Sequence, residues 1–201
     1  MAMGVDNMEI VFVRHGESIG NALKGDDAIY TGRWDCDLAE RGMQQAEDLI
    51  GDPVFENVEV IFVSDLKRAV DTANIISSRT DKIVDPRLAE RSLGEFEGRK
   101  IIDIESSPQY AKYFNDPSYM NFRKSFTARA PGGENYSGVC NRIRPFLMEL
   151  AKSRYKKIVI VSHFVVIRCI LKEICVLSEE ETLELRVPNC SPICVHWNGR
   201  L

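Results

Sequence analysis

The stretch Val11–Asn21, VFVRHGESIGN, contains the transition on which the interpretation of this chain depends. It begins with β-branched and aromatic residues, which are typical of a buried strand. The strand pattern then stops at Arg14-His15-Gly16. An arginine, a histidine and a glycine at this point form either a solvated turn or the floor of a reaction site, and the rest of the sequence decides between the two.

Short apolar runs recur along the chain and predict further strands. Three of these runs are continuous and rich in β-branched residues, as expected for strands that are covered on both faces. The predicted strands are Met8–Arg14, Val58–Ser64, Lys82–Pro86, Lys156–Ser162 and Pro192–Trp197.

Helical patterns separate these strands. The clearest pattern covers 64–77, where apolar residues recur at intervals of three and four and where Ser64 or Asp65 supplies the start signal. Further helices are predicted over 38–50, 137–152 and 164–174. The alternation of strands and helices predicts an α/β fold, namely a three-layer α/β/α sandwich with a mostly parallel central sheet.

One segment departs from this alternation. From Arg99 to Ala130 the chain is rich in aromatic residues, prolines and amides, which predicts short helices and loops over one end of the sheet. We expect 1–201 to form a single domain in which 99–130 is a lid or specificity insert. The alternative is a surface flap that only seals the core.

The charge pattern limits the partners of the protein. The chain of 201 residues has 26 basic and 30 acidic residues and a net charge of −4, without a basic stripe. This pattern predicts no nucleic-acid partner and no anionic-membrane partner. Residues 1–10 lack the pattern of a signal peptide, and no apolar run approaches the roughly 18 residues that span a membrane.

The cysteine pattern indicates reduced thiols. Six cysteines occur without paired C-x-x-C spacing, which favours a cytoplasmic protein. Cys190, Cys194 and His196 fit no common zinc pattern, so we expect no metal site there. The oligomeric state, monomer or homodimer, stays open at this stage.

Two of the three histidines follow predicted strands. In open α/β sheets, ligands bind at the carboxyl ends of the strands, and His15 and His163 both fall at such ends. Arg14 adjoins His15, and Arg68 lies in the first turn of the helix after strand 58–64. Guanidinium groups and helix starts at one place predict an anion site, to which Asn21 could donate without adding charge.

A histidine among arginines predicts phosphoryl transfer. Neutral imidazole is a competent nucleophile toward phosphorus, and the arginines would stabilise charge on the transferring oxygens. The leaving alkoxide needs an acid, and the segment 87–98 offers Glu90, Glu95 and Glu97 without a basis for choosing among them. The sequence has no P-loop, dinucleotide fingerprint or G-x-S-x-G elbow, which argues against nucleotide-driven transfer and serine hydrolysis.

Six blocks of sequence together resemble the histidine phosphatase superfamily, the phosphoglycerate mutase-like proteins. The resemblance extends from about Ile10 to Trp197 and is closer to the phosphatase and fructose-2,6-bisphosphatase-like branch than to full-length mutases. The blocks are RHGES with Asn21, 32–46, 64–73, 88–98, 131–135 and 159–171.

The resemblance implies a role for each matching residue. His15 would be the phosphorylated nucleophile, and Glu90 matches the proton donor of the family. His163 would complete the catalytic set and also hold the phosphoryl group. The remaining phosphate-binding residues would be Arg14, Asn21 and Arg68. The implied chemistry needs no metal and no other cofactor.

The sequence departs from the family pattern at Phe164, because many members have glycine after the second histidine. A bulky ring there would narrow the pocket. The insert 99–130 is shorter than in typical mutases, which favours water as the phosphoryl acceptor. We therefore expect a phosphomonoester hydrolase acting through a phosphohistidine. The alternatives are a phosphoglycerate mutase-type phosphotransferase and, as Phe164 would indicate, a catalytically weak phosphate-ester-binding or scaffold protein.

The substrate is expected to be a small phosphorylated metabolite, either a sugar phosphate or a phospho-acid. Basic residues outside the histidine site are candidates for binding a second anionic group, although each of them could equally be a solvated surface residue. These residues are Arg33, Arg91, Lys100, Arg123, Lys124 and Arg129.

Overall fold

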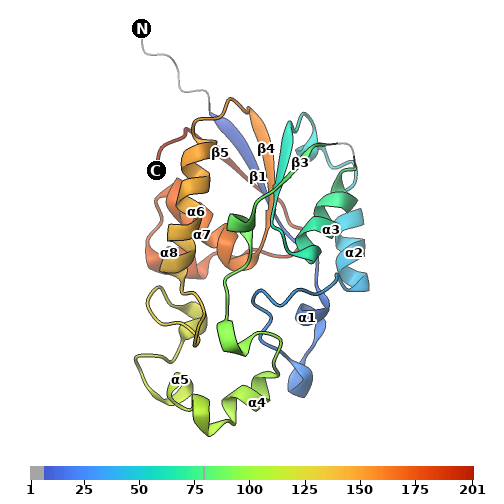
Figure 1. The fold of residues 1–201 in the computed structure, drawn as a ribbon. Coiled ribbons are helices and arrows are strands. Elements are labelled where there is room, and N and C mark those ends of the chain that lie inside the picture. The colour runs from blue at the N-terminus through green and yellow to red at the C-terminus, as the bar shows by residue number, and fades with distance from the viewer. Residues whose placement is uncertain (1–6, 79) are drawn as a thin grey trace.

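A five-stranded sheet forms the centre of the computed structural model, which describes residues 7–78 and 80–201. The strands are β1 Met8–Arg14, β2 Val60–Val63, β3 Lys82–Val84, β4 Lys157–Ser162 and β5 Ile193–Trp197. Their order is β3-β2-β4-β1-β5 (Figure 1). The first four strands are parallel and β5 runs antiparallel to β1, which confirms the predicted α/β fold with a mostly parallel sheet.

The register of the central strands brings their carboxyl ends to the same level. In the β1–β4 pair, Arg14 lies opposite Ser162, and the His15 N–H donates to the Ser162 carbonyl at 3.0 Å. The residues that follow the two strands, His15 and His163, are therefore neighbours although they lie far apart in the sequence.

Helices cover both faces of the sheet (Figure 1). Alternate residues of β1 point to opposite faces, so Val11 and Val13 join a different apolar cluster from Ile10 and Phe12. The cluster with Val11 and Val13 includes residues of α3 and Leu49, just after α2, and the other includes residues of α6 and α7. The longer helices are α2 Glu40–Glu47, α3 Lys67–Ile76, α6 Tyr136–Leu150 and α7 Phe164–Cys175, and the short helix α8 Glu179–Glu184 follows α7.

The predicted start of the helix over 64–77 was wrong. Helix α3 begins at Lys67, after the N-cap residue Leu66, and the Asp35 carboxylate accepts the Lys67 N–H at 2.9 Å. Ser64 has another role, because its hydroxyl accepts the Leu66 N–H at 3.2 Å and contacts His163.

Several predicted bounds were too long. Strand β3 ends at Val84 because the Asp85 carboxylate accepts the Arg87 N–H and starts a 3-10 turn over Pro86–Leu88. The short helices α1 Ile19–Ala22 and α8 were missed, since neither is long enough to give a helical period.

The segment 99–130 consists of short helices and loops, as the sequence predicts. It contains α4 Ile101–Glu105 and α5 Lys112–Asn115, and lies beyond the carboxyl ends of the parallel strands, next to α1 (Figure 1). Aromatic rings gather around Phe96 in a cluster distinct from the two cores of the sheet. Its rings are Tyr30, Tyr110, Tyr113, Phe114 and Phe122. A role of this segment as a lid stays a prediction.

Within residues 7–78 and 80–201, no helix combines the length and apolar character needed to cross a membrane. Residues 1–6, which belong to the stretch without a signal-peptide pattern, lie outside the described part of the chain. The six cysteines are free thiols, two of them exposed. In the described part, no three His, Cys, Asp or Glu side chains are grouped as a metal ion would require.

Candidate active site

One ring nitrogen of His15 donates a hydrogen bond to the backbone, and the other keeps its lone pair. The side chain is 3% exposed, and its Nδ1 lies 2.7 Å from the Gly16 carbonyl oxygen. A carbonyl oxygen only accepts hydrogen bonds, so Nδ1 carries the proton and Nε2 keeps its lone pair. The Nε of Arg68 donates to this Nε2 at 3.4 Å. The turn requires glycine at position 16, since a Cβ there would lie 2.2 Å from the Gly42 carbonyl oxygen.

The backbone around His15 is fixed from two other elements. The Asn189 side-chain amide donates to the His15 carbonyl at 2.6 Å. The Gly16 N–H donates to the Thr72 hydroxyl at 3.0 Å, and that hydroxyl donates to the Arg68 carbonyl in α3. Neither Asn189 nor Thr72 was predicted from the sequence, because neither directly follows a predicted strand.

His163 lies beside His15 at the start of α7. The two ring centroids are 4.9 Å apart, and His163 is fully buried. Its Nε2 is 2.7 Å from the Ser64 hydroxyl, which follows β2. Its Nδ1 is buried without a hydrogen-bond partner among the described residues. A buried polar atom without a partner is costly, so an anion accepting from this nitrogen would relieve that cost.

Both histidines are held in the neutral form. Burial lowers the pKa of His15 well below its usual value, and the charges of Arg68 and Arg14 lower it further. Burial likewise lowers the pKa of His163, with smaller contributions from His15, Arg68 and Arg14. At neutral pH the lone pair on His15 Nε2 is therefore available.

Arg68 is almost fully buried and is fixed by the loop that follows α1. It donates to the Gly32 carbonyl at 2.8 Å and to the Trp34 carbonyl at 3.0 Å. Gly32 has a φ of +49°, and a Cβ there would lie 2.7 Å from the Glu97 carboxylate. The loop therefore needs glycine at this position to hold Arg68 against His15.

Arg14 lies next to the residue that departs from the family pattern. It donates to the Val187 carbonyl at 3.0 Å, and burial lowers its pKa. Its guanidinium lies 5.1 Å from the centroid of the Phe164 ring, and the Arg168 guanidinium lies 3.9 Å from the same centroid. Phe164 thus contacts two cations as well as lining the adjoining cavity.

Of the three candidate acids, only Glu90 lies at the cavity in the described part of the chain. Its carboxylate accepts the Arg91 N–H at 2.7 Å and the Val165 N–H of the first turn of α7 at 3.5 Å. Glu95 accepts from the Tyr110 hydroxyl, and Glu97 accepts backbone N–H groups from two loops. Of the three glutamates, Glu90 is therefore the one whose position at the cavity fits the predicted acid.

A cavity of about 1000 Å³ adjoins this cluster and is lined by Arg14, Asn21, Glu90 and Phe164. Asn21 belongs to the capping box of α1, where its Oδ1 accepts from Ser18, so its Nδ2 is the group able to donate to an anion. The structure thus groups the six predicted site residues in two sets. The set at the cavity is Arg14, Asn21 and Glu90, and the buried set beside Arg14 is His15, Arg68 and His163.

Three of the six basic residues considered for a second anionic group also line this cavity, namely Arg91, Arg123 and Lys124. Two others have carboxylate partners. Arg33 pairs with Glu134 at 3.0 Å, and the exposed Lys100 pairs with Asp27 at 2.7 Å.

The family model of the histidine phosphatase superfamily (branch 1) matches residues 10–200. This chain belongs to that superfamily. The expected relationship is therefore confirmed, and the paired histidines with their arginines lie in a chain whose relatives are phosphatases and mutases.

Individual members of the superfamily cover nearly the whole chain. A 2,3-bisphosphoglycerate-dependent phosphoglycerate mutase of Neisseria meningitidis is 27% identical over 96% of both chains. Phosphoserine phosphatase 1 of Hydrogenobacter thermophilus is 28% identical over 96% of this chain and 88% of its own. The structure of a putative α-ribazole-5′-phosphate phosphatase from Escherichia coli has a TM-score of 0.77 and 25% identity, over 94% of this chain and 90% of the other.

Proposed function

We propose that this superfamily member is a phosphomonoester hydrolase that acts through a phosphohistidine formed on His15 Nε2. The observation that supports this most directly is the state of the imidazole. Its Nδ1 proton is committed to the Gly16 carbonyl, and its Nε2 lone pair lies beside the Arg68 guanidinium. This arrangement presents a neutral nucleophile to an anionic phosphoryl group.

In the first half-reaction, the Nε2 lone pair forms a bond to phosphorus while the bond from phosphorus to the alcohol oxygen breaks. Glu90 gives its proton to that leaving oxygen. Arg14, Arg68 and the Asn21 amide stabilise the charge on the phosphoryl oxygens. His163 Nδ1 joins them as a donor, provided that the Ser64 hydroxyl donates to its Nε2.

In the second half-reaction, water attacks the phosphohistidine and the Glu90 carboxylate takes a proton from it. The electrons of the phosphorus–nitrogen bond return to His15 Nε2, and inorganic phosphate leaves. Atoms and charge balance without a metal or a redox cofactor, so these residues are a complete set for hydrolysis.

We assign a small phosphorylated metabolite with a second anionic or polar group as the substrate. Arg91, Arg123 and Lys124 line the cavity together with Arg14 and would bind such a group. The names of relatives support a small substrate, since one is a phosphoserine phosphatase and another a putative α-ribazole-5′-phosphate phosphatase. The segment 99–130 supplies much of the cavity wall and is the candidate lid.

The second candidate function is a phosphoglycerate mutase-type phosphotransferase. It is favoured by the mutases that match 96% of the chain, and it uses the same phosphohistidine. A mutase returns the phosphoryl group to a bound acceptor, whereas a phosphatase passes it to water. Incubation with 3-phosphoglycerate and catalytic 2,3-bisphosphoglycerate distinguishes the two, because hydrolysis releases phosphate and mutase activity forms 2-phosphoglycerate.

The proposed function is tested with a panel of sugar phosphates, phosphoserine and phosphoglycerates, without added metal, beside a His15→Ala variant. We expect phosphate release by the wild-type protein and a loss of at least about a thousandfold in the variant, because no other nucleophile replaces the imidazole. Equal release by the two proteins would overturn the proposal.

A further inference from the structure

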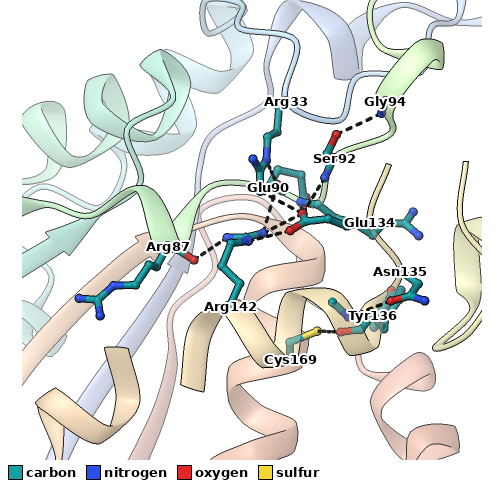
Figure 2. A network of polar contacts seen from close by, with 12 residues as sticks. Arg33, Arg87, Glu90, Ser92, Gly94, Glu134, Asn135, Tyr136, Arg142 and Cys169 are labelled. Carbon is teal, nitrogen blue, oxygen red and sulfur yellow. Dashed lines mark hydrogen bonds and ion pairs between the residues drawn. The ribbon is translucent and has the colours of Figure 1, made fainter. Parts of the chain in front are cut away.

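A network of charged side chains contacts the backbone of Glu90, and its members do not take part in the proposed reaction (Figure 2). Its centre is Glu134, in the loop before α6. Glu134 Oε1 accepts from Arg142 Nε at 2.9 Å, and Oε2 accepts from Arg33 Nη2 at 3.0 Å and Arg142 Nη2 at 3.1 Å. The same Oε2 accepts the Ser92 N–H at 3.0 Å. One carboxylate thus joins two arginines and the backbone two residues after Glu90.

Both arginines also bind the backbone of Glu90 (Figure 2). Arg33 Nε donates to the Glu90 carbonyl at 2.8 Å, and Arg142 Nη2 donates to the same oxygen at 3.4 Å. Arg142 also donates to the Arg87 carbonyl. The main chain from Arg87 to Ser92 is therefore anchored on both sides of Glu90 by groups that Glu134 holds.

The loop that carries Glu134 has little room to shift relative to the Glu90 loop. The Glu134 N–H donates to the Ser92 carbonyl at 2.8 Å. A Cβ on Gly133 would lie 2.8 Å from that carbonyl oxygen, and a Cβ on Gly94 would lie 2.1 Å from the Pro131 carbonyl oxygen. The two loops therefore contact each other backbone to backbone.

The charge on Glu134 is what keeps the two guanidinium groups together. Burial disfavours the ionised form, but hydrogen bonds from Arg142 and the Ser92 N–H, with the charges of Arg142 and Arg33, outweigh it and lower the pKa of Glu134. Without the carboxylate, two cations would converge on one carbonyl oxygen and repel each other.

We propose that Glu134, acting through Arg33 and Arg142, is a positioning residue that holds Glu90 in place to protonate the leaving group. This inference rests on the proposed function, in which Glu90 is the proton donor. Glu90 lines the cavity, whereas Glu134, Arg33 and Arg142 lie outside the set of residues that line it. A general acid must stay within hydrogen-bond reach of the leaving oxygen, and a displacement of about 1 Å costs on the order of a hundredfold in rate.

The test is a Glu134→Gln variant assayed with two substrates that differ in leaving group, glycerol phosphate and p-nitrophenyl phosphate. An alkoxide needs the proton from Glu90, whereas p-nitrophenolate leaves readily without it. We expect kcat/KM to fall about 30-fold for glycerol phosphate and less than about 3-fold for p-nitrophenyl phosphate. The comparison uses kcat/KM, because the second half-reaction, in which Glu90 takes the proton from water for either substrate, changes kcat and KM together and leaves their ratio unchanged.

Two further variants give the reference values for this comparison. In Glu90→Gln, kcat/KM should again fall more for glycerol phosphate than for p-nitrophenyl phosphate, and by a larger factor than in Glu134→Gln. Glu149→Gln is the matched control, because Glu149 lies on α6, is exposed and binds Arg87 rather than Glu90. In this variant, kcat/KM for either substrate should change by no more than about 2-fold. If Glu134→Gln does not fold, Arg142→Lys replaces it, since lysine keeps the charge but cannot bridge Glu134 and Glu90 as the guanidinium does.

The outcomes separate the two levels of the proposal. A fall in kcat/KM for glycerol phosphate but not for p-nitrophenyl phosphate, in both Glu134→Gln and Glu90→Gln, supports the positioning role. Selective loss in Glu90→Gln alone overturns the role of Glu134 and leaves the proposed function standing. If Glu90→Gln lowers kcat/KM equally for both substrates, Glu90 is not the proton donor, and the inference fails together with that part of the proposed function.

Discussion

At the scale of single residues, the chemistry depends on which nitrogen of His15 carries a proton. The Gly16 carbonyl decides this, because it can only accept from Nδ1. Burial and two arginines then keep Nε2 unprotonated. The same burial that keeps the lone pair available for the proposed nucleophilic attack also makes protonation of His15 unfavourable to the folded state.

The unfolding of the protein should therefore depend on pH below the ordinary range of histidine. The folded pKa values of His15 and His163 are lowered, so the unfolded chain binds more protons once the pH falls below about 6.5. As the pH is lowered from there to the folded pKa values, the free energy of unfolding decreases by up to about 1.4 kcal/mol per pH unit for each histidine. Urea unfolding of wild-type and His163→Gln proteins measures this, with a shallower slope expected for the variant. Identical slopes would show that His163 is not held neutral by burial.

Phe164 should stabilise the position of Arg14. Its ring contacts the Arg14 and Arg168 guanidinium groups, so Phe164→Leu removes both contacts while keeping an apolar side chain. A cation–π contact is worth about 0.5–2 kcal/mol, which corresponds to a rise of roughly 2- to 30-fold in KM. Steady-state kinetics measure the change, and Phe164→Tyr, which retains the ring, is the control. A lower KM in Phe164→Leu would indicate that the ring only obstructs the pocket.

At the scale of elements, the site is assembled where two parallel strands end at one level and a helix begins. His15 follows β1, while His163 follows β4 and starts α7. The first turn of α7 directs a backbone N–H toward Glu90. The segment 99–130 adds the far wall of the cavity, packed on an aromatic cluster that it forms together with Tyr30 and Phe96. The proposed phosphate site and the far wall of the cavity thus belong to separately packed parts of the molecule.

This separation predicts that the insert can be loosened without unfolding the sheet. Phe96 lies at the centre of the aromatic cluster and is fully buried, so Phe96→Ala should destabilise the insert by about 3–5 kcal/mol. Hydrogen exchange should become faster in 101–124 and stay slow in β1 and β4. Hydrogen exchange in Phe96→Ala is compared with that in Val139→Ala, a substitution in the core between α6 and the sheet. Faster exchange throughout the molecule in Phe96→Ala would contradict a separately packed insert.

At the scale of the whole molecule, the sequence predicted the sheet and the strand-end residues because both depend on local patterns. Continuous apolar runs identify buried strands, and residues after such runs lie at one edge of a parallel sheet. The contacts that complete the site join distant parts of the chain, which no local pattern reveals. Asn189 binds the His15 backbone, and Ser64 binds His163 across 99 residues. The start of α3 was mispredicted for the same reason, because Ser64 faces the site instead of capping the helix.

The most direct test of the central claim is to trap the phosphorylated protein. Wild-type protein mixed with p-nitrophenyl phosphate and quenched in alkali should carry one phosphoryl group that is labile in acid. Peptide mapping should place this group on His15. Glu90→Gln should accumulate more of it, because the variant lacks the carboxylate that activates water. His15→Ala should carry none. Turnover without a phosphorylated protein, or a phosphoryl group on another residue, would contradict the account.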